Sequence, residues 1–304
     1  ERAKNLLPQF FQERKLTYLN LTAGGYQIIW GLFKKMVIAD NAAIYVQQIF
    51  NDYSNYSGST LALGAVLFSF QIYGDFSGYS DIAIGIARLF GFSLMTNFSF
   101  PYFSRDIAEF WRRWHISLST WFRDYLYIPL GGSKGNTLQR LRNVFIVFLI
   151  SGFWHGANWT FIIWGAIHAL LFLPLLLSKR NRTYIDSTNI TFNQMPQLVL
   201  TFVLVTFAWI FFRADSVALA YQYIIDIFSF NGASLGLFYK TSKMILFSTI
   251  IVFSILILLL FEFLAVQKNK KEVVLSTYTE IFIAILICFM GVFKNPSEFI
   301  YFQF

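Results

Sequence analysis

The side chains best suited to proton transfer in this chain are its three histidines, His115, His155 and His168. Imidazole changes its charge near neutral pH, so histidine is the side chain that most often serves as a general acid or base. Successive histidines are 40 and 13 residues apart, and these separations do not match the short spacings of metal-ligand motifs. The pattern therefore favours acid–base chemistry and gives no support for a bound metal.

His155 lies in the stretch ISGFWHGANW, which has apolar sequence on both sides and is expected to form the middle of a membrane span. Ionisable residues inside membranes are costly and are usually functional. Because burial disfavours the charged imidazolium, we expect a neutral base that accepts the proton of a hydroxyl as its oxygen attacks an acyl carbonyl. The alternative is a structural histidine that is hydrogen-bonded between helices.

The neighbours of His155 suggest how the ring is held. On a continuous helix Asn158 would share a face with His155 and could orient the ring or the acyl oxygen. Gly152 and Gly156 would let another helix or a substrate approach the backbone closely. His168 would lie about 20 Å farther along the same helix, so we expect it to form a core hydrogen bond instead.

His115 lies in EFWRRWHISLS, within a block from Phe100 to Asn136 that alternates charged and aromatic side chains. Such a block suits a helix at the membrane surface or a re-entrant segment shielded by protein. Glu109 can pair with Arg112 or Arg113 at helical spacing. These arginines could equally hold phosphate groups of a donor or a lipid, or anchor the segment at the interface.

Two carboxylates, Asp75 and Asp81, follow directly after an apolar run. Gly74 and Gly78 are expected to break the helix there, so that polar backbone lines a cavity. The aspartates could form a proton path, as in a transporter, or pair with arginines. Their spacing does not choose between these roles.

The composition is that of an integral membrane protein, since 56% of the 304 residues are hydrophobic, 13% are charged and 37 are Phe. The net charge of +8 comes from basic clusters beside apolar segments, which indicates loop ends at a membrane rather than a nucleic-acid surface. Cys288, inside an apolar run, is expected to be a buried, inert thiol. We predict one all-α polytopic domain, residues 1–304, whose helical or apolar segments are Gly24–Phe50, Ser59–Tyr73, Asn143–Trp154, Asn158–Leu177, Leu198–Phe212, Met244–Val266 and Thr279–Phe293.

Three stretches resemble the membrane-bound O-acyltransferase (MBOAT) superfamily, and within it the alginate and peptidoglycan O-acetyltransferase branch. They are YGDFSGYSDIAIGIARLFGF (73–92), FPYFSRDIAEFWRRWHISLSTWFRDYLYIPLGGSKGN (100–136) and RNVFIVFLISGFWHGANWTFIIWGAIHAL (142–170). The ending GVFKNPSEFIYFQF and the opening ERAKNLLPQF also look like that branch. The resemblance implies a multi-helix bundle around a transmembrane tunnel, and we expect several N-terminal helices of a full-length member to be missing from this chain.

The resemblance also implies roles for individual residues. His155, in WHG, matches the near-universal catalytic histidine of the family, and His115, in RRWH, matches its second position on the cytoplasmic side. We expect Arg112 and Arg113 near the phosphates of the donor, Asn158 near the acyl group, and no permanently bound cofactor or metal.

The implied reaction takes an acetyl group from a cytoplasmic donor, acetyl-CoA, and passes it outward across the bacterial cytoplasmic membrane. The implied acceptors are exopolysaccharide or cell-wall sugars, reached directly or through a separate extracytoplasmic acetyltransferase. One alternative is another acyltransferase of the superfamily, acting in teichoic-acid D-alanyl transfer or lipid acylation. A proton-coupled transporter that uses Asp75, Asp81 and the histidines is a third hypothesis, but it predicts two similar halves, which the sequence does not show.

Overall fold

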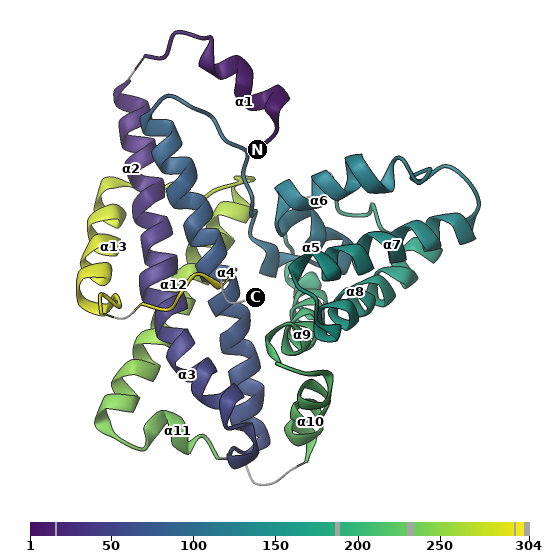
Figure 1. Ribbon diagram of the computed structural model, residues 1–304. Helices are drawn as coiled ribbons and strands as arrows, with labels where there is room; N and C mark the ends of the chain where they lie inside the picture. The colour runs from purple at the N-terminus through teal and green to yellow at the C-terminus, as the bar shows by residue number, and fades with distance from the viewer. Residues whose placement is uncertain (16, 186–188, 230–233, 295, 301–304) are drawn as a thin grey trace. The chain divides into compact units, whose positions relative to one another are not determined.

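The computed structural model describes residues 1–304 except 16, 186–188, 230–233, 295 and 301–304, so the last residues of the ending GVFKNPSEFIYFQF lie outside the described part. The described residues form helices and no strand, as predicted (Figure 1). In chain order the elements are α1 (Ala3–Phe10), α2 (Tyr18–Leu32), η1 (Phe33–Ala39), α3 (Asp40–Asn51), η2 (Tyr53–Asn55), α4 (Gly58–Leu89), η3 (Pro101–Phe103), α5 (Ile107–Arg113), α6 (Ile116–Phe122), η4 (Arg123–Tyr127), α7 (Thr137–His155), α8 (Trp159–Leu177), η5 (Phe192–Gln194), α9 (Met195–Arg213), α10 (Val217–Phe228), α11 (Gly236–Tyr239), α12 (Ser242–Gln267) and α13 (Thr277–Met290).

Within the described residues, three helical segments are long and apolar enough to cross a membrane. They are Trp159–Leu177, Phe192–Arg213 and Met244–Gln267, which correspond to α8, α9 with its preceding turn, and most of α12. The three matching predictions from the sequence are confirmed as helices. The predicted tunnel stays a prediction.

The chain divides into two compact units. Unit 1 comprises Glu1–Ile44, Phe70–Ser99 and Phe238–Gln303, and unit 2 comprises Tyr45–Ser69 and Phe100–Leu237. The long helix α4 contributes its first part to unit 2 and the remainder to unit 1.

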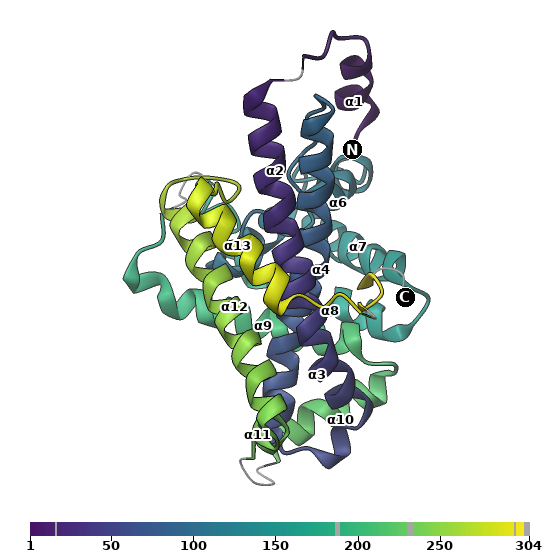
Figure 2. The same ribbon diagram turned by 90° about the vertical axis from the view of Figure 1, so that its left-hand side faces the viewer.

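Unit 1 is built on the close approach of α2 and η1 to the second part of α4. A Cβ atom on Gly31 would lie 2.6 Å from the Gly78 carbonyl oxygen, and one on Gly74 would lie 2.8 Å from the Lys34 carbonyl oxygen. The predicted helix break is therefore wrong: α4 runs unbroken from Gly58 to Leu89, and its glycines permit tight packing instead. Figure 2 shows α12 and α13 alongside α2.

α13 carries the one cysteine of the chain. It buries Ile283, Leu286 and Ile287, whereas Cys288 is exposed on another face of the helix. The prediction of a buried thiol is therefore wrong.

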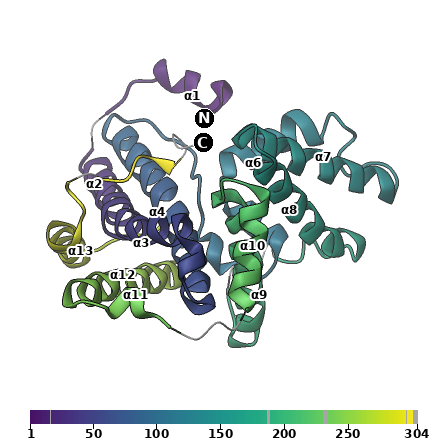
Figure 3. The same cartoon turned by 60° about the horizontal axis from the view of Figure 1, so that its bottom comes forward.

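Unit 2 is built on the hairpin of α7 and α8, with α9 packed against α8 and α10 against α9 (Figure 3). The two hairpin helices approach so closely that a Cβ atom on Gly152 would lie 2.2 Å from the Phe161 carbonyl oxygen. One on Gly165 would lie 2.3 Å from the Phe148 carbonyl oxygen. The expectation that Gly152 admits a neighbouring helix is confirmed.

The block 100–136 is neither a single helix nor a regular span. It consists of the short helices η3, α5, α6 and η4, interrupted at Trp114 and His115. Helix α5 packs on both α8 and α9, so the block lies against the hydrophobic helices of its own unit.

Candidate functional site

His155 is the last residue of α7 and stands at a turn. Gly156 caps the end of α7, and α8 begins at Trp159 after Asn158, whose side chain accepts a hydrogen bond of 3.1 Å from the Thr160 amide. The sequence placed His155 in the middle of a span, and that expectation is wrong. The chain reverses here because Gly156 ends one helix and an Asn cap starts the next.

Asn158 does not share a helical face with His155, contrary to expectation, because the turn separates them. Its side-chain amide donates a 3.0 Å hydrogen bond to the Asp215 carbonyl oxygen, while its oxygen caps α8. Both the nitrogen and the oxygen of the side-chain amide are therefore hydrogen-bonded to backbone groups.

Aromatic rings surround the imidazole of His155. Its ring centroid lies 5.0 Å from those of Trp154 and Phe212 and 5.2 Å from that of Trp164, which meets it edge-on at 90°. His155 lies in the turn, outside the three candidate spans, and burial there lowers its pKa, with the nearby His115 lowering it further. A neutral imidazole is the form that can accept a proton.

His115 occupies the junction between α5 and α6 in a left-handed backbone conformation, with φ 44° and ψ 54°. This region costs about 1–3 kcal/mol for a residue other than glycine, and such strain is concentrated at functional sites. The residue is 8% exposed, and burial lowers the pKa of His115 to about 4.

The structure brings the two candidate catalytic histidines to a common neighbour. The Trp154 ring centroid lies 6.4 Å from that of His115 and 5.0 Å from that of His155. Their separation of 40 residues in the sequence gave no indication of this contact. Trp154 is therefore a site residue that the sequence reasoning missed, although it directly precedes His155.

Three buried or partly buried charged side chains, Arg105, Glu109 and Arg113, form an ion triplet at α5, the helix that precedes His115 in the chain. Glu109 accepts from Arg105 at 2.8 Å and from Arg113 at 2.7 Å. Burial raises the pKa of the Glu109 carboxyl, but hydrogen bonds and charge from the two arginines outweigh it, so the net pKa is lowered. The predicted pairing with Arg113 is confirmed, whereas the role of Arg105 was missed.

The two arginines proposed to bind phosphate differ in their surroundings. Arg113 is held by Glu109, whereas Arg112 donates a 2.9 Å hydrogen bond to the Asn181 carbonyl oxygen and keeps its second terminal nitrogen buried without a hydrogen-bond partner. Burial lowers the pKa of Arg112. Arg112 therefore has a terminal N–H group available to donate to a phosphate oxygen.

His168 is fully buried in the same aromatic cluster. Its Nδ1 accepts a 3.3 Å hydrogen bond from the Trp111 indole, which confirms the predicted core hydrogen bond. Its ring centroid is 4.9 Å from that of Trp164, which also contacts His155. The expected 20 Å separation along one helix is wrong, because the turn after His155 folds α8 back beside α7.

Asp75 and Asp81 belong to unit 1. Asp75 pairs with Lys35 at 2.5 Å and Asp81 with Lys34 at 2.6 Å, so both form ion pairs, one of the two alternatives, but with lysines instead of arginines. Among the described residues, no group of three or more His, Cys, Asp or Glu side chains is arranged to hold a metal ion.

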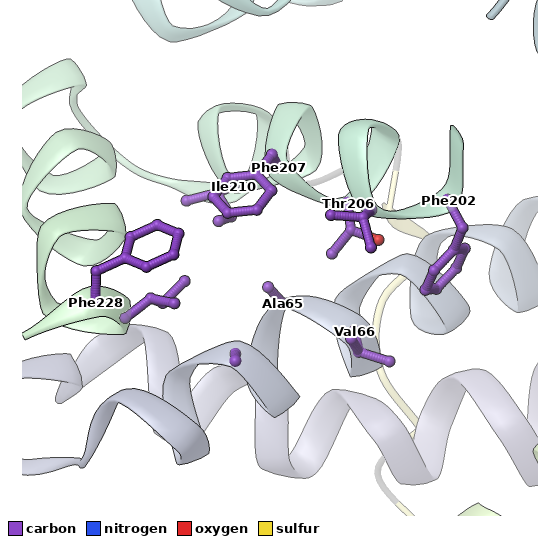
Figure 4. Close-up of a pocket in the computed structure, with 10 residues that line it drawn as sticks. Ala65, Val66, Phe202, Thr206, Phe207, Ile210 and Phe228 are labelled. Atoms are coloured by element: carbon purple, nitrogen blue, oxygen red, sulfur yellow. The ribbon is translucent and has the colours of Figure 1, made fainter. Parts of the chain in front are cut away.

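Unit 2 also contains an apolar cavity of about 220 Å³ between the first part of α4, α9 and α10. Figure 4 shows Ala65 and Val66 across the cavity from Thr206 and Phe207. Its lining includes no histidine or charged side chain, so it offers no group for acid–base chemistry.

Comparison with known proteins matches residues 4–211 to the model of the MBOAT, membrane-bound O-acyltransferase family. The chain is 40% identical over 230 residues to a probable alginate O-acetylase of Pseudomonas aeruginosa, covering 76% of this chain and 43% of the relative. It is 37% identical over 235 residues to a peptidoglycan O-acetyltransferase of Helicobacter pylori, covering 76% and 44%. A teichoic acid D-alanyltransferase of Bacillus subtilis is 32% identical over 138 residues, covering 43% and 35%.

The chain thus spans less than half the length of each of these relatives. The family match covers both candidate histidines and all three stretches in which the resemblance was found. The chain belongs to the membrane-bound O-acyltransferase family.

Proposed function

We propose that the protein is a membrane O-acyltransferase of the bacterial cytoplasmic membrane, which moves an acetyl group from acetyl-CoA to hydroxyls of an exopolysaccharide or cell-wall polysaccharide. The observation that carries this proposal is the meeting of His115 and His155 at the Trp154 ring, in a setting that favours the neutral base. The names of two relatives, an alginate O-acetylase and a peptidoglycan O-acetyltransferase, support acetyl transfer to a polysaccharide.

In the proposed reaction His155 accepts the proton of the acceptor hydroxyl while its oxygen forms a bond to the acetyl carbonyl carbon. The carbon–sulfur bond then breaks, and the proton passes from His155 to the sulfur, giving the ester and the free thiol of CoA. Atoms and charge balance without a metal or redox cofactor. Aromatic rings around His155 limit access of water, which reduces hydrolysis of the donor.

The proposed roles of the other side chains depend on which of their hydrogen-bonding groups are not already used within the fold. The unpartnered nitrogen of Arg112 supports contact with a donor phosphate, with Arg113 beside it in sequence but held by Glu109. His115 would position the donor or assist proton transfer. Asn158 would act through the turn that holds His155, since its side chain caps α8.

The proposal includes a second route to the acceptor, in which a partner protein, an extracytoplasmic acetyltransferase, takes over the acetyl group. A second candidate function is D-alanyl transfer to teichoic acid, favoured by the Bacillus subtilis relative. Both functions use the same base, so they differ in donor and acceptor rather than in the role of His155. Mass spectrometry of the exported polymers, with and without the protein, separates acetyl from alanyl esters.

The central experiment incubates the full chain in vesicles with labelled acetyl-CoA and polysaccharide acceptor. His155→Ala should lower acetyl transfer by about 100-fold or more, because a general base contributes about that factor. Lys134→Ala, at an exposed position in the same unit, is the control and should retain transfer. Equal incorporation into membranes shows that the variant folds. Transfer at the unaltered rate by His155→Ala would refute the proposal.

A further inference from the structure

Three buried N–H groups in unit 2 have no hydrogen-bond acceptor within the described part of the chain. They are Nε1 of Trp164, Nε1 of Trp209 and Nε2 of His168, on residues that are 1%, 1% and 0% exposed. Their rings form one cluster, with centroids 4.9 Å apart for Trp164 and His168, 5.7 Å for the two tryptophans and 6.4 Å for His168 and Trp209.

All three nitrogens are donors. An indole nitrogen can only donate. Nδ1 of His168 accepts from the Trp111 indole, so in the neutral ring the proton is on Nε2. The three nitrogens therefore offer hydrogen to a ligand and accept none, so the group they bind is an acceptor such as an oxygen with free lone pairs.

Such a cluster is unusual in a folded protein. Buried polar groups are nearly always hydrogen-bonded. Leaving one without a partner costs about 1–3 kcal/mol. Three such groups in one cluster therefore lower the stability of the folded chain unless a ligand supplies the acceptor. Trp164 also contacts the base, because its ring lies perpendicular to that of His155 with centroids 5.2 Å apart.

We propose that the N–H groups of Trp164, Trp209 and His168 bind the carbonyl oxygen of the acyl group that is transferred. This inference rests on the proposed function. It adds to that reaction the groups that stabilise the negative charge on the carbonyl oxygen. As the hydroxyl oxygen bonds to the carbonyl carbon, the electron pair of the C=O double bond moves onto this oxygen, and the donors stabilise the negative charge. When the carbon–sulfur bond breaks, the pair returns and the C=O double bond is restored.

Replacing each tryptophan with Phe keeps an aromatic ring and removes the N–H. Trp164→Phe or Trp209→Phe should lower kcat by about 100-fold, as loss of one oxyanion donor does in other enzymes, with KM changed by less than about 3-fold. The matched control is Trp121→Phe, because Trp121 lies in the same unit and is 48% exposed. Its kcat should stay within about 2-fold. Unchanged kcat in both site variants would overturn the inference.

A second measurement does not depend on turnover. In the His155→Ala background, acetyl-CoA labelled with ¹³C at the carbonyl is bound, and its carbonyl stretch is recorded by isotope-edited infrared spectroscopy. Hydrogen bonding should shift the band below its frequency in solution, and adding Trp164→Phe should move it back.

The outcomes separate the two proposals. If acetyl-CoA binds but Trp164→Phe leaves the band in place, the inferred binding of the acyl oxygen by these N–H groups is refuted. The assignment of His155 as the base is then unaffected. If acetyl-CoA does not bind, or if His155→Ala transfers at the unaltered rate, the proposed function fails, and the inferred site for the acyl oxygen fails with it.

Discussion

Each unit buries ionisable side chains, but the two units treat them in different ways. In unit 1 two buried charges meet opposite charges: Lys34 lies 2.6 Å from Asp81, and Asp40 lies 2.8 Å from Lys35. In unit 2 the histidines pack among aromatic rings, as the fully buried His168 does with Trp164 and the half-buried His155 does with Phe212.

The network of unit 1 extends over several helices. Lys34 also donates to the Ser77 hydroxyl at 2.9 Å, and the Tyr73 hydroxyl donates to Glu262 on α12 at 2.5 Å. Asp75 accepts from the amide of Ile300, which fixes a segment near the end of the described chain. These contacts join η1, α4 and α12, so the charges of unit 1 serve the packing of its helices.

The difference shows how buried ionisable side chains that stabilise the fold can be distinguished from those that act on a substrate. A buried charge with a partner is neutralised and has little capacity left for a ligand. A neutral imidazole among rings, or an N–H without an acceptor, keeps its capacity for a substrate. Unit 2 also contains a structural ion triplet, Arg105–Glu109–Arg113, and it holds the helix that leads to His115.

The largest expected effect on stability comes from removing one partner of a charge pair in unit 1. Lys34 is 3% exposed, so Lys34→Met leaves the Asp81 carboxylate without its cation and should lower the free energy of unfolding by about 3–5 kcal/mol. Denaturation in detergent measures this loss. The double variant Lys34→Met with Asp81→Asn removes both charges and should recover part of it.

The matched control is an exposed pair in unit 2. Arg123 and Asp124 lie 2.7 Å apart, but the arginine side chain is 59% exposed. Arg123→Met should therefore cost no more than about 1 kcal/mol. Equal losses for Lys34→Met and Arg123→Met would contradict the view that the charges of unit 1 are structural.

A pH titration tests the treatment of histidine in unit 2. Burial lowers the pKa of His115 to about 4, whereas the unfolded chain binds this proton near pH 6.5. Below pH 6.5 the unfolded state thus holds more protons, so stability should fall as the pH decreases towards 4, by up to about 1.4 kcal/mol per pH unit from this residue. His115→Gln should flatten that slope. An identical slope in the variant would show that His115 does not titrate in this way.

The backbone of His115 gives a smaller effect that separates strain from chemistry. Glycine adopts the left-handed conformation without the steric cost that Ala has. His115→Gly should therefore be more stable than His115→Ala by about 1 kcal/mol, while both variants lose the imidazole and its contribution to transfer. Greater stability of the Ala variant in denaturation would mean that the position is not strained.

The sequence predicted well what depends on local composition. The apolar segments 158–177, 198–212 and 244–266 were found because long runs of apolar residues have few alternatives to a helix that can cross a membrane. The pairing of Glu109 with Arg113 followed from helical spacing.

The sequence failed where a turn or a long-range contact decides the outcome. His155 was placed inside a continuous helix because WHGAN interrupts apolar sequence only briefly, and the expected positions of Asn158 and His168 relative to it were then wrong. Gly74 and Gly78 were taken as helix breakers, since the tight packing against Lys34 and Gly31 that they permit involves distant sequence. The meeting of His115 and His155 at Trp154 depends on how α5 and the hairpin pack.

The smallest expected effect concerns Asn158, whose predicted role was to orient the ring or the acyl oxygen. Its side chain caps α8 and bonds to the Asp215 carbonyl oxygen, so Asn158→Ala should lower stability by about 1 kcal/mol, the usual value for a lost cap. Asn158→Asp keeps the capping oxygen and should recover most of that loss. If Asn158 acts only through the turn, acetyl transfer per folded molecule should fall less than about 10-fold in the Ala variant and recover in the Asp variant. A loss as large as that of His155→Ala, unrelieved by Asp, would place the amide at the reacting atoms, and Asn158 would then belong with the chemical groups of unit 2 rather than with its structural ones.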